Sequence, residues 1–259
     1  MTVIPPEIYI FAFVFGLCIG SFLNVCIYRL PESMSIVRPP SSCPQCKAPI
    51  RFYDNIPVIS YLILRGKCRH CETSISFRYP FIELLTGLCA VSVVFKFGVT
   101  VESLIYFVFI ATLITITFID IDHQIIPDVI SLPGIVVFLL ASFGVPSVTF
   151  KESVMGILIG GGVLYAVALA YVLIKKREGM GGGDIKLLAM IGALLGWKGV
   201  LFTLFVSSLL GTVTGILVMV RTGENMRLAI PFGPFLSIGA VLHVFWGPFL
   251  IHWYLSLHK

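Results

Sequence analysis

The sequence predicts an all-α polytopic membrane protein with about eight transmembrane helices and one small cytoplasmic loop domain resembling a zinc ribbon. Of its 259 residues, 58% are hydrophobic and 12% are charged, and the mean hydropathy is +1.01. A soluble domain carries about twice that share of charge, roughly 25%. The apolar residues fall in long runs, and about 20 such residues allow a helix to cross the hydrocarbon core. Lipid offers the backbone no hydrogen-bond partner, so these runs are expected to be helices.

The expected spans, in order, cover residues 8–27, 81–97, 104–119, 129–145, 153–174, 185–197, 200–220 and 228–255. The sixth span is too short to cross the bilayer upright, so a broken or re-entrant helix is expected there. The first span follows no basic residue and ends without a small-residue cleavage site, which predicts a retained anchor and no cleaved signal. Eight crossings would place both termini on the same side.

The basic residues predict the orientation. If the loop at 29–79 faces the cytoplasm, the Lys and Arg residues left outside are four of 18: Lys96, Lys151, Lys198 and Lys259. This bias follows the positive-inside rule for short loops. We therefore expect a multi-pass protein of the cytoplasmic membrane with both termini outside. The loops also account for the net charge of +5, so no nucleic-acid partner is expected.

The cytoplasmic loop contains two Cys-x-x-Cys pairs, formed by Cys43, Cys46, Cys68 and Cys71. Two such pairs about 20 residues apart are typical of a four-thiolate zinc site. Disulfides are disfavoured in a reducing compartment, and a redox pair would need a thioredoxin-like context that is not seen. The zinc is expected to be structural, because a polar loop of about 50 residues cannot build a sufficient core. His70 could replace a ligand, although a solvated histidine is the favoured interpretation.

The remaining cysteines and several acidic residues lie in or beside the spans. Cys18, Cys26 and Cys89 are expected to be small buried hydrophobic residues. Asp120 closes the third span and Asp184 follows three glycines before the sixth. Ionisable groups at membrane depth are costly and therefore point to function.

A pair of carboxyl groups is suited to peptide hydrolysis by water. When two carboxyl groups share one proton, the ionised one can take a proton from water while the protonated one polarises the peptide carbonyl. The glycines before Asp184 would let the backbone turn tightly and approach an extended substrate. Asp120 and Asp184 are therefore candidates for a catalytic pair.

The same acids could instead be interfacial residues or helix caps. Asp184 would suit a cap of the sixth helix, and Asp128 would suit the first turn of the fourth. The capping interpretation is favoured for Asp128, whereas Asp122 could support a catalytic site. His123 is expected to be an ordinary interfacial histidine.

An ordered set of motifs resembles the bacterial prepilin peptidases, also called type IV leader peptidases, over nearly the whole chain. The set comprises Gly20-Ser21-Phe22-Leu23-Asn24-Val25, Tyr28-Arg29-Leu30-Pro31, Asn55-Ile56-Pro57, both cysteine pairs, Ile75-Ser76-x-Arg78-Tyr79-Pro80-x-x-Glu83, Asp120-x-Asp122 through Asp128, and Gly181-x-Gly183-Asp184. On this resemblance Asp120 and Asp184 would be the two catalytic aspartates.

The resemblance implies cleavage of the basic leader from type IV prepilins and type II secretion pseudopilins at the cytoplasmic face of the bacterial inner membrane. It also implies N-methylation of the new N-terminal residue by S-adenosylmethionine. The cysteine loop would belong to the methyltransferase-bearing members, with no donor site located in the sequence. Glu83 could take part in that reaction or make a structural polar contact.

The expected division of the chain is a first transmembrane helix at 1–28, the cytoplasmic four-cysteine loop at 29–79 and a transmembrane aspartyl peptidase domain at 80–259. Two other functions share part of the pattern. A presenilin-like intramembrane protease would use the same aspartates without needing the cysteine loop. A proton-coupled transporter or metal-sensing receptor is less compatible, since transporters tend to show repeated halves and charges at the midplane.

Overall fold

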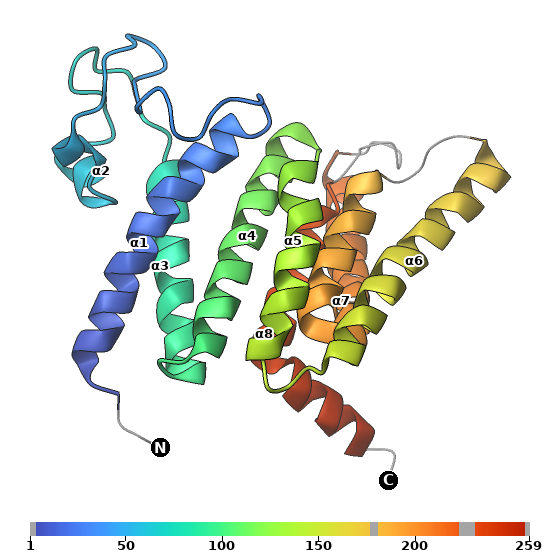
Figure 1. The fold of residues 1–259 in the computed structure, drawn as a ribbon. Helices are drawn as coiled ribbons and strands as arrows, with labels where there is room; N and C mark the ends of the chain where they lie inside the picture. The colour runs from blue at the N-terminus through green and yellow to red at the C-terminus, as the bar shows by residue number, and fades with distance from the viewer. Residues whose placement is uncertain (1–3, 177–180, 223–230, 257–259) are drawn as a thin grey trace. The chain divides into compact units, whose positions relative to one another are not determined.

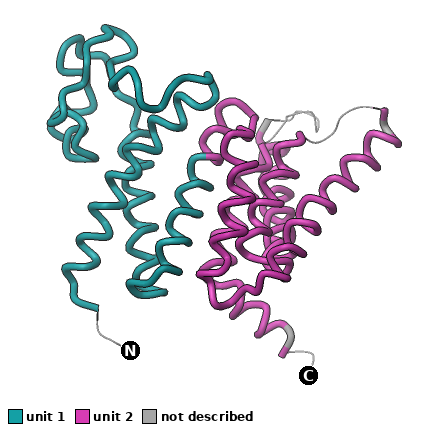
Figure 2. The backbone as a smooth tube through the Cα atoms, viewed as in Figure 1, with its two compact units in different colours: residues 1–115 teal, residues 116–259 magenta. Residues whose placement is uncertain are grey.

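The computed structural model describes residues 4–176, 181–222 and 231–256, and these residues form helices without an extended strand (Figure 1). The fold divides into two units, residues 1–115 and 116–259 (Figure 2). The helix α4 (Val101–His123) runs from the first unit into the second. Three of the basic positions used to predict the orientation, Arg177, Arg227 and Lys259, lie outside the described residues, as does the start of the eighth predicted span at 228–230.

Unit 1 consists of two long helices, a loop domain and the first part of α4. Its other elements are α1 (Pro6–Arg29), the 3-10 helix η1 (Phe52–Asn55), α2 (Ile59–Ile63) and α3 (Arg78–Phe97). Helix α3 ends at Gly98, whose φ of 74° turns the chain into α4. The ring of Phe97 lies 4.8 Å from that of Tyr106 and fixes this turn.

Glycines bring α1 and α3 into close antiparallel contact. A Cβ on Gly16 would lie 2.7 Å from the Cα of Gly87, and one on Gly20 would lie 2.7 Å from the Cα of Glu83. Gly16 and Gly20 form the Gly-x-x-x-Gly pattern with which membrane helices approach each other closely. This contact holds Glu83 against the C-terminal half of α1.

Unit 2 consists of the end of α4 and a set of packed helices. In chain order these are α5 (Asp128–Ala141), the 3-10 helix η2 (Ser142–Gly144), α6 (Phe150–Lys175), α7 (Gly182–Thr222) and α8 (Gly233–Ser256). Helix α6 begins with a capping box, in which Thr149 and Glu152 satisfy each other's backbone N–H groups. Lys198 also binds Glu152 at 3.2 Å, which ties the start of α6 to α7.

Helix α7 is a hairpin of two arms that meet at Gly196, whose backbone is not helical (φ 69°, ψ −179°). The first arm (182–195) runs antiparallel to α6, because Gly192 lies against Gly156 and Leu188 against Gly160. The second arm (197–222) runs antiparallel to α8.

The start of α8 shows that the second arm returns to the end where the first arm began. Gly183 in the first arm and Gly233 in α8 both lie against Ile126, while Gly211 late in the second arm lies against Phe235 near the start of α8. The hairpin therefore brings the first turn of α7 close to the first turn of α8.

All eight predicted spans coincide with helices, and the expected break near the sixth falls at Gly196, between the two arms of α7. Six helices of the described residues are long and apolar enough to cross a membrane. One of them is α7, whose apolar stretch of 40 residues includes both arms, and residues 128–144 form a shorter apolar helix. The third predicted span ended too early. Helix α4 continues to His123, so that Asp120 and Asp122 belong to its last turn.

The first arm of α7 is the most deeply buried helix of unit 2. The side chains of Leu187, Leu188, Met190, Ile191 and Leu194 have no exposed surface. By contrast, apolar side chains on the outer helices are exposed, as expected for helices in contact with lipid. A short helix surrounded by protein does not need the length of a lipid-exposed span, which explains how this arm forms from few residues.

Candidate functional site

Asp120 lies in the last turn of α4 and is almost completely buried, with 5% of its surface exposed. Its Oδ2 accepts a hydrogen bond of 3.0 Å from the backbone N–H of Gly233, the first residue of α8. The first N–H groups of a helix have no partner within the helix and carry partial positive charge, so they favour an anion at this position. A Cβ on residue 233 would lie 2.6 Å from that oxygen. Only glycine allows the backbone to come this close.

Asp184 lies in the first turn of α7 and is half-buried. Its carboxyl group is close enough to that of Asp120 for the two charges to interact. The side chain of Ile126 lies against both Gly183, next to Asp184, and Gly233, which binds Asp120. The end of α4 and the starts of α7 and α8 thus bring together two carboxyl groups that are 64 residues apart in the sequence (184 − 120).

The other acids near this pair are on the surface. Asp122 is exposed, as is His123 at the end of α4. Asp128 is the first residue of α5 and makes a salt bridge of 2.6 Å with Lys186, its side chain being 59% exposed. The prediction that Asp128 lies in the first turn of a helix is confirmed. Asp184 is not the N-cap residue of α7, because the helix begins two residues earlier, at Gly182, and Asp184 lies in its first turn.

The cysteine module (residues 41–76) consists of two knuckles with the same backbone pattern 25 residues apart. In the first, the N–H of Cys43 binds the carbonyl of Ala48, and that of Lys47 binds the carbonyl of Cys43. The N–H groups of Cys68 and Glu72 make the equivalent bonds in the second. Lys47 and Glu72 both have a positive φ, 58° and 56°. Each knuckle therefore turns its two cysteines toward one point.

The four predicted cysteines come together. All four Sγ atoms lie within 4.8 Å of one another. Across the knuckles, Cys43 is 3.8 Å from Cys71 and Cys46 is 4.0 Å from Cys68. A tetrahedral ion with metal–sulfur bonds of about 2.3 Å requires sulfurs about 3.8 Å apart, so the cluster could hold a metal ion such as zinc. His70 is exposed and does not belong to the cluster, which agrees with the favoured interpretation of a solvated histidine.

Hydrogen bonds in the knuckles favour thiolates at Cys43 and Cys71, whereas burial and the neighbouring thiols raise the pKa of the Cys46 thiol to about 11. The side chain and the backbone N–H of Thr73 lower the pKa of the Cys71 thiol to about 6. The backbone N–H groups of Cys46 and Gln45 lower the pKa of the Cys43 thiol. Metal ligation requires deprotonated thiols, so this environment is suited to binding a cation.

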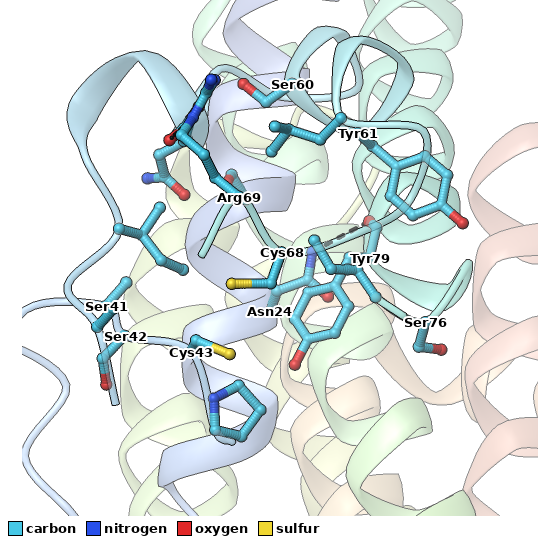
Figure 3. Close-up of a pocket in the computed structure, with 18 of the residues that line it drawn as sticks. Asn24, Ser41, Ser42, Cys43, Ser60, Tyr61, Cys68, Arg69, Ser76 and Tyr79 are labelled. Carbon is cyan, nitrogen blue, oxygen red and sulfur yellow. Dashed lines mark hydrogen bonds and ion pairs between the residues drawn. The ribbon is translucent and has the colours of Figure 1, made fainter. Parts of the chain in front are cut away.

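A cavity of about 500 Å³ lies between the cysteine module and the adjoining ends of α1 and α3 (Figure 3). The module contributes Cys43 and Cys68 to its wall, and α1 contributes Asn24, whose amide donates a hydrogen bond of 3.1 Å to the carbonyl of Tyr79 (Figure 3). Glu83 of α3 also lines the cavity. Its Oε2 accepts a hydrogen bond of 2.7 Å from the N–H of Val58 and so ties the loop to the helix.

Comparison with known proteins identifies the family. Residues 14–97 match the bacterial peptidase A24 N-terminal domain, and residues 107–216 match the type IV leader peptidase family. A Pseudomonas putida protein named prepilin leader peptidase/N-methyltransferase is 37% identical over 94% of this chain and 92% of its own length. Proteins of that name from Aeromonas hydrophila (36%, over 98% and 96%) and Neisseria gonorrhoeae (38%, over 92% and 90%) are similarly close. No solved structure matches the chain.

The chain belongs to the type IV leader peptidase family. The resemblance predicted from its motifs is therefore confirmed, and the presenilin-like and transporter alternatives are not favoured. Together with the six apolar helices, membership identifies an integral protein of the inner membrane.

One contact of this leader peptidase was not predicted from the sequence. Gly233 follows Phe232 and precedes Pro234 at the start of an apolar run, a pattern that signals a helix start but not a carboxylate contact. The expectation for the span cysteines is correct only in part. Cys26 is buried, Cys89 is intermediate and Cys18 is exposed on the outer surface of α1.

Proposed function

We propose that this chain cleaves the leader peptide from type IV prepilins and type II secretion pseudopilins, and then N-methylates the exposed N-terminal residue. Relatives that match nearly the full chain are named prepilin leader peptidase/N-methyltransferase. The observation that carries the peptidase proposal is the pairing of Asp120 with Asp184 at three converging helix ends.

Cleavage proceeds by general acid–base catalysis within the aspartate pair. Two carboxyl groups that interact in a poorly solvated site can share one proton between them. The ionised group removes a proton from water, which attacks the scissile carbonyl. The protonated group donates to the carbonyl oxygen and later delivers a proton to the leaving nitrogen. The N–H of Gly233 orients Asp120 throughout, because it binds Oδ2 and leaves Oδ1 for water or substrate.

Methylation uses S-adenosylmethionine, which supplies an electrophilic methyl group when bound. The neutral N-terminal nitrogen of the cut pilin forms a bond to the methyl carbon as the carbon–sulfur bond breaks. Sulfur keeps the electron pair, and the methylated ammonium releases one proton to solvent. This step needs an oriented amine and not the aspartate pair.

Zinc bound by Cys43, Cys46, Cys68 and Cys71 stabilises the cysteine module. The sulfur–sulfur distances and the lowered thiol pKa values of Cys43 and Cys71 support this assignment. The ion has a structural role, since the module has few buried apolar side chains of its own.

The active site faces the cytoplasm, as the positive-inside rule predicts for a loop at 29–79 on that side. Residues 29–79 form the part associated with methyl transfer, and residues 80–259 form the peptidase domain.

The test is the mass of a co-expressed prepilin processed by single variants. Asp120→Asn and Asp184→Asn should each reduce leader cleavage by about 10³-fold or more, because an amide cannot take up or donate the proton as the carboxyl group does. Asp122→Asn is the matched control, and its effect should be much milder. Thermal unfolding in detergent checks that each variant is folded. Wild-type processing by either of the first two variants would exclude the aspartate mechanism.

A further inference from the structure

Glu83 is a buried carboxyl group for which the peptidase mechanism has no use. It is 8% exposed and lies at the start of α3, where a charge is costly unless it is paired. Its hydrogen-bond partners are neutral: the N–H of Val58 and the side chain of Ser21. Within the described part of the chain, no basic side chain forms a salt bridge with it.

Four basic residues line the same cavity, and none of them forms a salt bridge with Glu83: Arg29, Lys47, Arg69 and His70. Lys47 and His70 are exposed, and the two arginines bind other groups. Arg29 donates hydrogen bonds of 2.8 Å to the carbonyls of Ser35 and Pro39. Arg69 binds both carboxylate oxygens of Asp54, which lowers the pKa of that carboxyl group. Glu83 is therefore a buried acid that no basic side chain of the cavity pairs with, and a ligand that carries positive charge would supply that partner.

The size and lining of the cavity narrow the class of ligand. Its volume of about 500 Å³ is within the range of about 300–1,000 Å³ typical of sites for small molecules and cofactors. The wall combines the rings of Tyr28 and Tyr79 with the amide of Asn24 and several hydroxyl groups. Asn24 and Tyr79 are labelled in Figure 3. Aromatic faces stack on a purine and attract a cation, while the polar groups suit a ribose.

We propose that this cavity binds the methyl donor S-adenosylmethionine, with Glu83 as the counter-charge of its sulfonium. The proposal rests on the methyltransferase half of the proposed function and adds the place where it occurs. Since α1, α3 and both knuckles contribute to the wall, loss of the metal would open the site. The aspartate pair belongs to another unit, which agrees with separate reactions.

The test compares two ligands that differ in charge at sulfur. S-adenosylmethionine carries the sulfonium, whereas S-adenosylhomocysteine has a neutral thioether at the same position. Binding of each to the purified full-length protein in lipid nanodiscs is measured by equilibrium dialysis. Glu83→Gln should weaken S-adenosylmethionine binding by about tenfold or more, as expected for loss of a charged partner, and change S-adenosylhomocysteine binding by less than about threefold.

Glu32→Gln is the matched control, because it removes an exposed carboxyl group near the end of α1 that does not line the cavity. It should bind both ligands as the wild type does. Equal effects of Glu83→Gln on the two ligands, or no effect on either, would overturn the pairing with the sulfonium. Unchanged donor binding with a loss of pilin binding would assign Glu83 to the substrate ammonium instead.

A second measurement does not depend on any variant. Wild-type protein labelled with a photoreactive azido-adenosyl analogue of the donor should be modified in peptides between residues 21 and 83. Labelling confined to unit 2 would exclude this cavity. Prepilin cleavage by Glu83→Gln should remain near the wild-type rate, so a failure of the donor site is distinguished from a failure of the peptidase proposal.

Discussion

The cysteine module of unit 1 and the aspartate site of unit 2 hold polar groups at a membrane helix end by different means. The module places four sulfurs within 4.8 Å of one another from a stretch of 29 residues, 43–71. The aspartate site takes its parts from positions 120, 184 and 233, which only the packing of three helices brings together. One site is local and depends on a metal, and the other is distributed and depends on close helix contacts.

This difference determines how each site should fail. A loop with two short knuckles has little apolar surface to bury, so loss of the ion removes most of what holds it. The aspartate site is anchored by the first arm of α7, whose core side chains are fully buried. The aspartate site should be most sensitive to substitution at positions where the backbone itself contacts a carboxyl group.

The largest expected effect comes from removing the metal. Replacing Cys43 and Cys46 together by Ser should release the ion and disorder the module, since two thiolates cannot hold it. Methylation should fall by about 10³-fold or more while cleavage changes by less than about threefold, because metal binding is coupled to the folding of this module alone. The measurement is the mass of co-expressed pilin, in which the methyl group adds about 14 Da, together with the zinc content of the purified enzyme.

The converse experiment tests whether methylation is independent of the aspartate pair. Asp120→Asn and Asp184→Asn proteins supplied with pre-cut pilin should still methylate it.

A double replacement of Cys18 and Cys89 by Ser is the matched control for the Cys43 and Cys46 variant, because these thiols lie outside the metal cluster. Equal loss of both activities in the Cys43 and Cys46 variant would mean that the module supports the whole fold, and the two sites would then not be independent.

A smaller effect is expected from one glycine of the aspartate site. Gly233→Ala leaves the backbone unstrained, because residue 233 does not have a positive φ, but its methyl group would lie 2.6 Å from Oδ2 of Asp120. Displacement of the carboxyl group by a fraction of an ångström to 1 Å should reduce cleavage by about 100-fold. The rate of cleavage of a prepilin peptide by the purified variant measures this.

Gly215→Ala is the control for Gly233→Ala, because a Cβ at 215 meets no atom within 4 Å. Its cleavage rate should equal that of the wild type. Normal cleavage by Gly233→Ala would show that the N–H contact with Asp120 has no part in catalysis. Methylation of pre-cut pilin should be unchanged in both variants, as the two units are expected to act separately.

The two sites also differ in how far they could be predicted from sequence. The cysteine ligands were predictable, because the spacing within and between the pairs fixes the ligand set. Asp120 and Asp184 were predictable as acids at helix ends, and the family motifs selected them among thirteen acidic residues. Gly233 was not, because its role is defined by a contact across 113 residues that leaves no local pattern.

The fold shows the same limit. Apolar runs predicted every long helix but not η1 and α2 in the loop, and they could not distinguish a lipid-exposed span from the protein-surrounded first arm of α7. Both are hydrophobic, and only packing against Gly134, Gly156 and Gly160 shows that this arm is enclosed. The Gly-x-x-x-Gly pattern of Gly16 and Gly20 likewise indicates a close contact with another helix, but the sequence does not identify α3 as that helix.

The smallest expected effect concerns the salt bridge between Asp128 and Lys186, which links α5 to the first turn of α7 two residues from Asp184. Its side chains are 59% and 35% exposed, and exposed pairs contribute little because water and salt screen them. Asp128→Asn and Lys186→Gln should each change the cleavage rate by less than about threefold, and the double variant should show only weak coupling between them.

The ionic strength of the assay separates a surface pair from a positioning element. Any effect of Asp128→Asn should diminish between about 0.1 M and 1 M salt, since the screening length falls from about 10 Å to 3 Å over that range. A loss of about 100-fold that persists in high salt would mean that Asp128 and Lys186 fix the position of Asp184. The aspartate site would then extend to the surface of unit 2. In that case the two sites would differ less in solvent exposure than the burial of Asp120 implies.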